Sequence, residues 1–341
     1  MVERDRIVAA LEDATYASSI HNSQPWRFQI VGDSVAVLLD GEATPRTVDP
    51  SGRWALASIG AVVANLELAL TTHTGLATST ELRVGEVPTG DTAGGAAYGG
   101  RPLAVVTLSE SPASPQVLSE AGRLGGAIRA RLTTRAPLQG GAPESEEWGE
   151  ISTAVSASEV LEARQAAEPL VRALLRLTAE SEVERQDDAD YLEEIEQWVS
   201  RTNDTGIPLA SVGLPDADGR VPTRDFTQTP LGSAAGGEAA FFEDRPALLV
   251  LTSSGDTPTE QLLGGYAMQR AMLEATVLGL GIGVLGQALE EPASRALVND
   301  AASDAFGEAV VVHQILRLGH PLGELSHVPT PRRAVAEVIL P

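Results

Sequence analysis

The spacing of apolar residues predicts alternating helices and strands in the first third of the chain. Helical periodicity near the start gives way to strict alternation around a Gly-Asp turn, which is typical of a β-hairpin. A nearly all-apolar segment follows and predicts a helix buried on most sides. The predicted elements are a helix over 3–17, a hairpin over 27–41, a buried helix over 49–73 and strands over 79–84 and 103–108.

The remainder of the chain repeats these patterns after an acidic region. We predict a helical start at 122–138, mostly helical structure over 143–201 with a break at Pro169, a buried strand over 245–253, a second apolar helix over 264–281 and a strand over 310–318. Residues 202–244 show little periodicity. A segment of that length is expected to be a lid, a binding loop or disordered.

The two apolar helices resemble each other. Gly60 is followed at +8 by Leu68, and Gly265 is followed at the same spacing by Leu273. Each helix leads into strands, so the pattern favours two related α+β halves. Because few positions carry the similarity, coincidence remains the alternative.

Composition excludes several kinds of chemistry. The chain has 341 residues and no cysteine, which excludes disulfides, thiolate metal sites and cysteine nucleophiles. All 24 basic residues are arginine, so Schiff-base and P-loop lysines are excluded. A net charge of −23 argues against nucleic-acid and anionic-membrane partners, which require a basic surface.

The sequence also predicts a cytoplasmic location. No uninterrupted apolar run reaches the ~18 residues of a membrane span. The first 16 residues carry charges that interrupt any apolar core, so they do not resemble a signal peptide.

Glycines at 281, 283 and 286 have the spacing of a dinucleotide fingerprint, but their context does not fit. The fingerprint requires a strand before the glycines and a helix after them, whereas here a helix precedes them. The five histidines lack metal-ligand spacing, and no G-x-S-x-G nucleophile elbow occurs. We therefore predict neither a metal site nor a catalytic nucleophile.

Two arginine pairs suggest an anion site. Arg131 and Arg135 flank Thr133, and Arg332 and Arg333 are adjacent near the C-terminus. Guanidinium groups with hydroxyls form forked, charge-assisted hydrogen bonds to phosphate. The alternative, ordinary surface salt bridges, stays open on these residues alone.

Together these segments resemble the FMN-dependent nitroreductase superfamily, and within it the two-repeat, single-chain, Acg-like branch. The segments that carry the resemblance are SSIHNSQPWRF (18–28), DPSGRWALASIGAVVANLELAL (49–70), RLTTRAPL (131–138), LEATVLGLGIGVLGQ (273–287) and ILRLGHP with PTPRR (315–321 and 329–333). Their ordered series spans nearly the whole chain.

The resemblance implies an α+β fold of two nitroreductase-like halves, each a mixed or antiparallel sheet packed with helices. Residues 1–120 would form the first half and residues 121–341 the second, which includes a lid over about 202–244. The halves would form an intramolecular pseudo-dimer, so that a monomer acts as an internal dimer.

The resemblance also implies one FMN per chain, because each half retains only one of the two flavin-binding motifs. The first half would supply Ser19, Asn22 and Gln24 of the N-x-Q-P-W segment. The second would supply Arg131, Thr133, Arg135 and an arginine of the pair Arg332 and Arg333 for the phosphate, with Leu285, Gly286 and Gln287 at the flavin N5 edge. No side chain is expected to act as a catalytic acid or base.

The function that follows is an FMN-dependent oxidoreductase, which would transfer hydride from NAD(P)H through flavin N5 to a small electrophile. One alternative is an FMN-binding or storage protein whose lid blocks turnover. Another is a biosynthetic flavin-dependent dehydrogenase or oxidase. The sequence does not identify the substrate.

Overall fold

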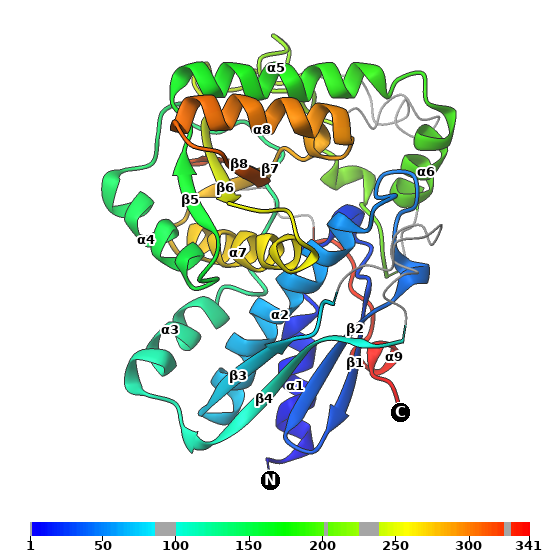
Figure 1. Ribbon diagram of the computed structural model, residues 1–341, viewed down its shortest axis with the longest axis vertical. Coiled ribbons are helices and arrows are strands. Elements are labelled where there is room, and N and C mark those ends of the chain that lie inside the picture. The colour runs from blue at the N-terminus through cyan, green and yellow to red at the C-terminus, as the bar shows by residue number, and fades with distance from the viewer. Residues whose placement is uncertain (1, 86–99, 201–203, 225–238, 324–328) are drawn as a thin grey trace. The chain divides into compact units, whose positions relative to one another are not determined.

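The computed structural model describes residues 2–85, 100–200, 204–224, 239–323 and 329–341 (Figure 1). The predicted lid segment therefore lies partly outside the described residues. The chain forms two compact units. Unit 1 comprises Met1–Arg131, Thr257–Val277 and Arg332–Pro341, and unit 2 comprises Leu132–Asp256 and Leu278–Pro331.

These compact units differ from the continuous segments 1–120 and 121–341. Residues 257–277 and the C-terminal residues 332–341 pack with the first part of the chain. A compact unit is defined by packing, whereas a half is defined by the repeated order of its strands and helices. The compact units therefore do not test the predicted bounds of the halves, which stay a prediction.

Unit 1 contains a four-stranded antiparallel sheet in the order β1-β2-β4-β3. Its strands are β1 (Trp26–Val31), β2 (Ser34–Leu39), β3 (Leu76–Leu82) and β4 (Pro102–Pro112), and its helices are α1 (Arg4–Ala14), α2 (Arg53–Thr74), α3 (Pro115–Gly125), α7 (Pro258–Val277) and α9 (Val335–Val338). Alternate residues of β1, including Trp26 and Phe28, point into the core, which α2 covers. The C-terminal residues lie against β1, where Leu340 N donates to Phe28 O at 2.7 Å.

Unit 2 contains a second antiparallel sheet, in the order β5-β6-β8-β7. Its strands are β5 (Glu162–Gln165), β6 (Ala247–Ser253), β7 (Gly281–Val284) and β8 (Val311–Gly319), and its helices are α4 (Ser145–Ser156), α5 (Glu168–Glu184), α6 (Ala189–Ser200) and α8 (Pro292–Phe306). Helices α5 and α8 lie side by side (Figure 1). Every residue of β6 is buried, which explains why its first five residues, 247–251, are all apolar.

The two sheets have the same topology. In each, two strands precede a long apolar helix and two strands follow it, and the strand order 1-2-4-3 of the first sheet is repeated as 5-6-8-7 in the second. The repeat of Gly60 and Gly265 falls at corresponding places in α2 and α7. The fold is thus α+β with two halves of the same topology, as the sequence predicts.

Helices α2 and α7 cross at these two glycines. A Cβ atom added to Gly60 would lie 1.8 Å from the carbonyl oxygen of Leu262, and one added to Gly265 would lie 1.8 Å from that of Ala57. The two contacts are equivalent, because Leu262 lies three residues before Gly265 and Ala57 lies three residues before Gly60. Such reciprocal contacts are what an approximate two-fold axis between equivalent helices produces.

Helix α2 corrects the expectation that no segment could cross a membrane. Its best 18-residue window has a mean hydropathy of 1.5 despite the polar Asn65 and Glu67. By length and composition alone, the helix is therefore long and apolar enough to cross a membrane. Because 89% of that window is buried inside the protein, the helix has the burial of a core helix.

Most predicted elements are confirmed, with errors at irregular boundaries. The helix predicted to start at residue 122 is wrong, because α3 begins at Pro115 and ends at Gly125. Ser114 caps α3 by accepting a hydrogen bond from Val117 N at 3.3 Å. Strand β5 inside the acidic region and helix α8 are not predicted by the sequence pattern. Pro169 does interrupt the acidic stretch, since it lies in the first turn of α5.

The crossing of α2 and α7 gives the first prediction. Gly265→Ala should lower the free energy of unfolding by about 3 kcal/mol, because the added methyl group meets backbone that cannot move independently. Gly122→Ala is the matched control in α3, where an added Cβ has no neighbour within 4 Å. It should leave stability unchanged or raise it by about 0.5 to 1 kcal/mol. Urea denaturation measures both, and equal midpoints would contradict the close crossing.

Candidate functional site

The N-x-Q-P-W segment forms a tight loop between α1 and β1 of unit 1. His21, Asn22 and Gln24 have φ values of 48°, 54° and 51°, which lie in the left-handed region that residues with side chains rarely adopt. The loop is held internally, because Ser19 Oγ accepts a hydrogen bond from Gln24 N at 3.0 Å. Such strained backbone persists only where its surroundings fix it, and it concentrates at functional sites.

The two apolar helices of unit 1 anchor this loop. Ser58 Oγ in α2 accepts from Ile20 N at 3.3 Å, and Gln269 Oε1 in α7 accepts from Ser18 N at 3.0 Å. The Gln269 amide also donates to Asn65 Oδ1 at 2.8 Å. Polar residues inside otherwise apolar helices thus hold the backbone of the motif in place.

The C-terminal residues bind the same loop. Arg332 Nη1 donates to Asn22 Oδ1 at 3.0 Å, and Arg333 N donates to Gln24 Oε1 at 2.9 Å. The Arg333 guanidinium forms an ion pair with Asp40 at 3.1 Å. The structure therefore brings together, within unit 1, two groups of residues that the sequence placed in different halves.

Arg131 and Arg332 converge on Tyr16, and we call Tyr16, Asn22, Arg131 and Arg332 the Tyr16 cluster. Arg131 Nη2 donates to Tyr16 O at 3.3 Å, and the Arg332 guanidinium lies over the Tyr16 ring, 5.3 Å from its centroid. Arg131 is only 7% exposed. Burial, and then the charge of Arg332, lower the pKa of Arg131 to about 9, and burial lowers the pKa of Arg332 to about 10.

The remaining residues of the RLTTR segment lie in unit 2, beside strand β7. Thr134 N donates to Ile282 O at 2.7 Å. A Cβ atom on Gly283 would lie 2.6 Å from Thr134 O, so this glycine permits the close approach of the two segments. Two of the glycines that resemble a dinucleotide fingerprint, Gly281 and Gly283, therefore have a packing function, and helix α7 rather than a strand precedes them.

Arg135 is half-buried, and its Nη1 donates to Ser211 O at 3.0 Å. Burial, and then the charge of Arg224, lower the pKa of Arg135 to about 10. Both Ser211 and Arg224 belong to the described part of the segment 202–244. That part of the segment therefore contacts a predicted phosphate-binding residue directly.

A buried ion pair holds the RLTTR segment against the second sheet. Arg317 in β8 pairs with Glu243 at 2.5 Å and donates to Ala136 O at 2.6 Å, while Glu243 Oε2 accepts from Leu138 N at 3.0 Å. Both charged side chains are almost fully buried, so the pair satisfies backbone groups as well as each other. These contacts fix residues 136–138 immediately after Arg135.

The segment Leu285, Gly286 and Gln287 follows β7 in unit 2. Leu285 N donates to Ile315 O at 2.9 Å, and Gln287 is buried at the start of a short 3₁₀ helix. Gln287 lines a cavity of about 30 Å³, which is room for one or two water molecules.

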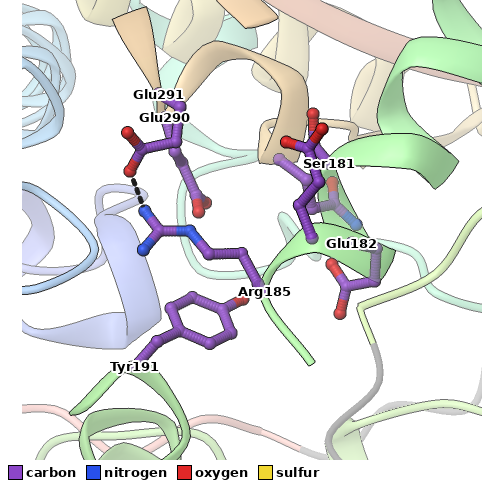
Figure 2. A pocket seen from close by; sticks show the side chains of 8 residues that line it. Ser181, Glu182, Arg185, Tyr191, Glu290 and Glu291 are labelled. Atoms are coloured by element: carbon purple, nitrogen blue, oxygen red, sulfur yellow. Dashed lines mark hydrogen bonds and ion pairs between the residues drawn. The ribbon is translucent and has the colours of Figure 1, made fainter. Parts of the chain in front are cut away.

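Charged residues surround this cavity (Figure 2). Arg185 forms an ion pair with Glu291 and lies over the Tyr191 ring at 4.9 Å from its centroid. Glu290 is paired with Arg224. Burial raises the pKa of Glu290 to about 7, although the charge of Arg224 opposes that shift. The cavity is thus bounded by compensated charges close to Gln287.

The predicted site residues therefore fall into two groups. Unit 1 brings together Ser19, Asn22, Gln24, Arg131, Arg332 and Arg333, and unit 2 contains Thr133, Arg135, Leu285, Gly286 and Gln287. Sequence reasoning missed Tyr16, Arg224 and Glu290. Tyr16 is a lone tyrosine near the end of a helix, and Arg224 and Glu290 are 66 residues apart in the sequence. Neither arrangement forms a motif that could be recognised in a short stretch of sequence. Within the described ranges, no group of three His, Asp or Glu side chains could hold a metal ion.

Comparison with known proteins identifies relatives over the full length. The chain is 30% identical over 346 residues to the protein named "Putative NAD(P)H nitroreductase acg" of Mycobacterium tuberculosis H37Rv, covering 99% of this chain and 96% of that protein. It is 25% identical to "Putative NAD(P)H nitroreductase Rv3131" of the same strain, with coverage of 99% and 92%. No family model matches the chain.

Solved structures of similar fold give weaker likenesses. A nitroreductase with bound FMN from Desulfitobacterium hafniense has a TM-score of 0.40 at 16% identity, covering 64% of this chain and 97% of that one. An FMN- and NADPH-dependent nitroreductase from Sphigopyxis gives 0.39 at 15%, covering 63% and 97%. The assignment therefore rests on the full-length relatives: with 30% identity across nearly all of both chains, the protein belongs to the Acg-like family of nitroreductases.

Proposed function

We propose that this protein is a cytoplasmic FMN-dependent oxidoreductase that accepts hydride from NAD(P)H and passes it to a small electrophile. The names of its relatives support the general kind of activity, since two of them are named "Putative NAD(P)H nitroreductase". The nitroreductase of similar fold from Desulfitobacterium hafniense has FMN bound.

The observation that carries the proposal is the pair of positive charges in the Tyr16 cluster. The chain has 47 acidic residues for 24 arginines, so carboxylate partners are abundant. Surface arginines such as Arg83 and Arg129 bond to carboxylates that raise their pKa. The pKa of Arg131 is instead lowered by burial and by a second cation. Two guanidinium groups held near each other form a local concentration of positive charge that suits an anion.

The donor groups of the cluster fit the terminal phosphate of FMN. Guanidinium groups offer forked N–H donors that match phosphate oxygens, and two of them would neutralise most of its charge. Arg332 is better placed than Arg333 for this function, because Arg333 is paired with Asp40. The motif also holds unsatisfied polar atoms. Ser23 Oγ and Trp26 Nε1 are buried and make no hydrogen bond within the described part of the chain.

The remaining residues have assignments that follow from the family. The isoalloxazine of a bound FMN would supply the hydride chemistry. The chain would hold the phosphate with Arg131 and Arg332, and the family resemblance also assigns Thr133 and Arg135 to the phosphate. The half-buried hydroxyl of Ser19 would contact the ribityl chain. Leu285, Gly286 and Gln287 would line the ring edge.

A storage protein remains the second candidate. Its support is the contact of Ser211 with Arg135 and of Arg224 with Glu290, because both contacts come from the segment 202–244. A segment that covers bound FMN would keep nicotinamide away from the ring.

We expect purified protein to be yellow and to release FMN, not FAD, on denaturation. Under anaerobic conditions NADH or NADPH should bleach the visible absorbance of the flavin, which stopped-flow spectroscopy follows. Bleaching by neither nucleotide, with FMN bound, would favour storage. Protein that is colourless and does not bind added FMN would exclude both candidates.

Replacing Arg131 tests the anion site through two opposite effects. Arg131→Met should weaken FMN binding about 10- to 100-fold through the loss of charge-assisted hydrogen bonds. The apo protein should be at least as stable, because the lowered pKa shows that folding disfavours the charged guanidinium at neutral pH. Flavin fluorescence and thermal melting measure the two effects.

The matched control is Arg176→Met on α5, where the exposed guanidinium pairs with Glu180 at 2.9 Å. This substitution should change neither FMN affinity nor melting temperature appreciably, because an exposed pair contributes little. If Arg131→Met destabilises the apo protein and leaves FMN affinity intact, Arg131 is a structural residue.

The stoichiometry should be one FMN per chain in a monomeric protein. The RLTTR sequence and the N-x-Q-P-W sequence each occur once, so a second complete site cannot form. Covalent connection also makes assembly of the halves independent of concentration. Absorbance gives the ratio of flavin to protein, and light scattering gives the mass. Two tight FMN per chain, or flavin release when an obligate dimer is diluted, would refute this assignment.

A further inference from the structure

We propose that Gln24 is a positioning residue, which docks the C-terminal residues 329–341 so that Arg332 reaches Arg131. The inference rests on the proposed FMN site. It differs from a direct contact between Gln24 and the flavin, because it assigns the Gln24 amide to an internal hydrogen bond that acts on the phosphate through another residue.

The Gln24 side chain is fully buried, and both ends of its amide have internal partners. Oε1 accepts from Arg333 N at 2.9 Å, and Nε2 donates to Asn22 O at 3.3 Å. The first contact joins the motif to the C-terminal residues through a backbone amide, which cannot rotate away as a side chain can. The register of Arg333, and hence of the adjacent Arg332, is set by this bond.

The strained loop is built around that bond. Left-handed backbone at Asn22 and Gln24 turns both side chains toward the C-terminal residues, where Asn22 Oδ1 accepts from Arg332 and Gln24 Oε1 accepts from Arg333. The adjacent residues Arg332 and Arg333 therefore each donate a hydrogen bond to a side-chain oxygen of the motif. This arrangement gives a physical reason for the strain that a simple connection between α1 and β1 would not require.

Independent contacts hold the C-terminal residues on the far side of Arg332. Asp40 bridges Arg333 and Arg27, at 3.1 and 2.8 Å. Leu340 N donates to Phe28 O at 2.7 Å, and Phe28 forms a parallel bridge with Ile339. Removing the Gln24 acceptor would thus leave the segment attached to β1 and the arginine side chains bonded to Asn22 and Asp40, but would release the backbone at Arg333, next to Arg332.

Substitution of Gln24 by leucine tests docking. Gln24→Leu removes the acceptor for Arg333 N and should weaken FMN binding about 10- to 100-fold, as loss of Arg332 would. Unchanged FMN affinity in a folded Gln24→Leu protein would overturn the inference.

Riboflavin, which lacks the phosphate, gives a second discrimination. Its affinity should be unchanged in Gln24→Leu, because only the phosphate contact is lost, whereas a contact to the ring or ribityl chain would weaken riboflavin and FMN alike. Gln29→Leu in β1 is the matched control, since Gln29 is half-exposed in the same unit. It should bind both flavins as the wild type does.

A double mutant and hydrogen exchange complete the test. In an Arg332→Ala background, Gln24→Leu should add less than about a twofold further loss of FMN affinity, because the two residues act through one contact. If the losses of FMN affinity in the two single variants multiply in the double variant, the inference is overturned. Amide exchange of residues 329–341 in the flavin-free protein should accelerate in Gln24→Leu and not in Gln29→Leu.

The exchange measurement also separates this inference from the proposed function. If wild-type protein binds no FMN, the proposed function fails, and the inference about the flavin fails with it, while faster exchange would still establish the docking bond. If FMN binds and Gln24→Leu alters neither affinity nor exchange, only the positioning inference is overturned.

Discussion

The fold depends on the direct contact between α2 and α7 at Gly60 and Gly265. Because neither glycine has a side chain, each helix approaches the backbone of the other, and most residues of both helices are buried. Close packing then leaves their buried polar residues with fixed partners. Ser58 and Gln269 are examples, since both anchor the backbone of the N-x-Q-P-W loop. The packing of α2 against α7 thereby determines where the N-x-Q-P-W loop can lie.

Electrostatics distinguishes the arginines of the site from the arginines of the scaffold. Arg317 is buried but paired with Glu243, so its charge is compensated and it fixes a segment of backbone. Arg333 is likewise paired with Asp40. For Arg131 and Arg135, a neighbouring arginine lowers a pKa that burial has already lowered. In a chain so rich in carboxylates, an arrangement that places cation beside cation suits an anionic ligand, and it is the basis of the proposed function.

The periodicity of apolar residues predicts the repeated strands and helices, but it does not predict how these elements begin or how they pack together. Hairpin β1-β2 and helices α2 and α7 are predictable because their apolar patterns are long and regular. Helix α3 is misplaced because its start depends on a single Ser-Pro cap. Family resemblance identifies the motif residues but not Tyr16, because its contribution depends on a ring that lies near residue 332 only in the folded chain. The same limit applies to the packing of residues 257–277 and 332–341 with unit 1, which no local pattern encodes.

The hydrogen-bonding capacity of each motif residue decides which of them can contact a ligand. A primary amide offers two N–H donors and an oxygen with two lone pairs, and the fully buried Gln24 makes an internal hydrogen bond at each end of its amide. Ser19 is half-buried, and its hydroxyl accepts one bond from Gln24 N but retains a proton that it can donate. In the proposed site, residues of one short motif would therefore divide between supporting the site and contacting the ligand. Spacing along the sequence identifies the motif, whereas the internal hydrogen bonds of Gln24 are the basis for proposing that it supports the site.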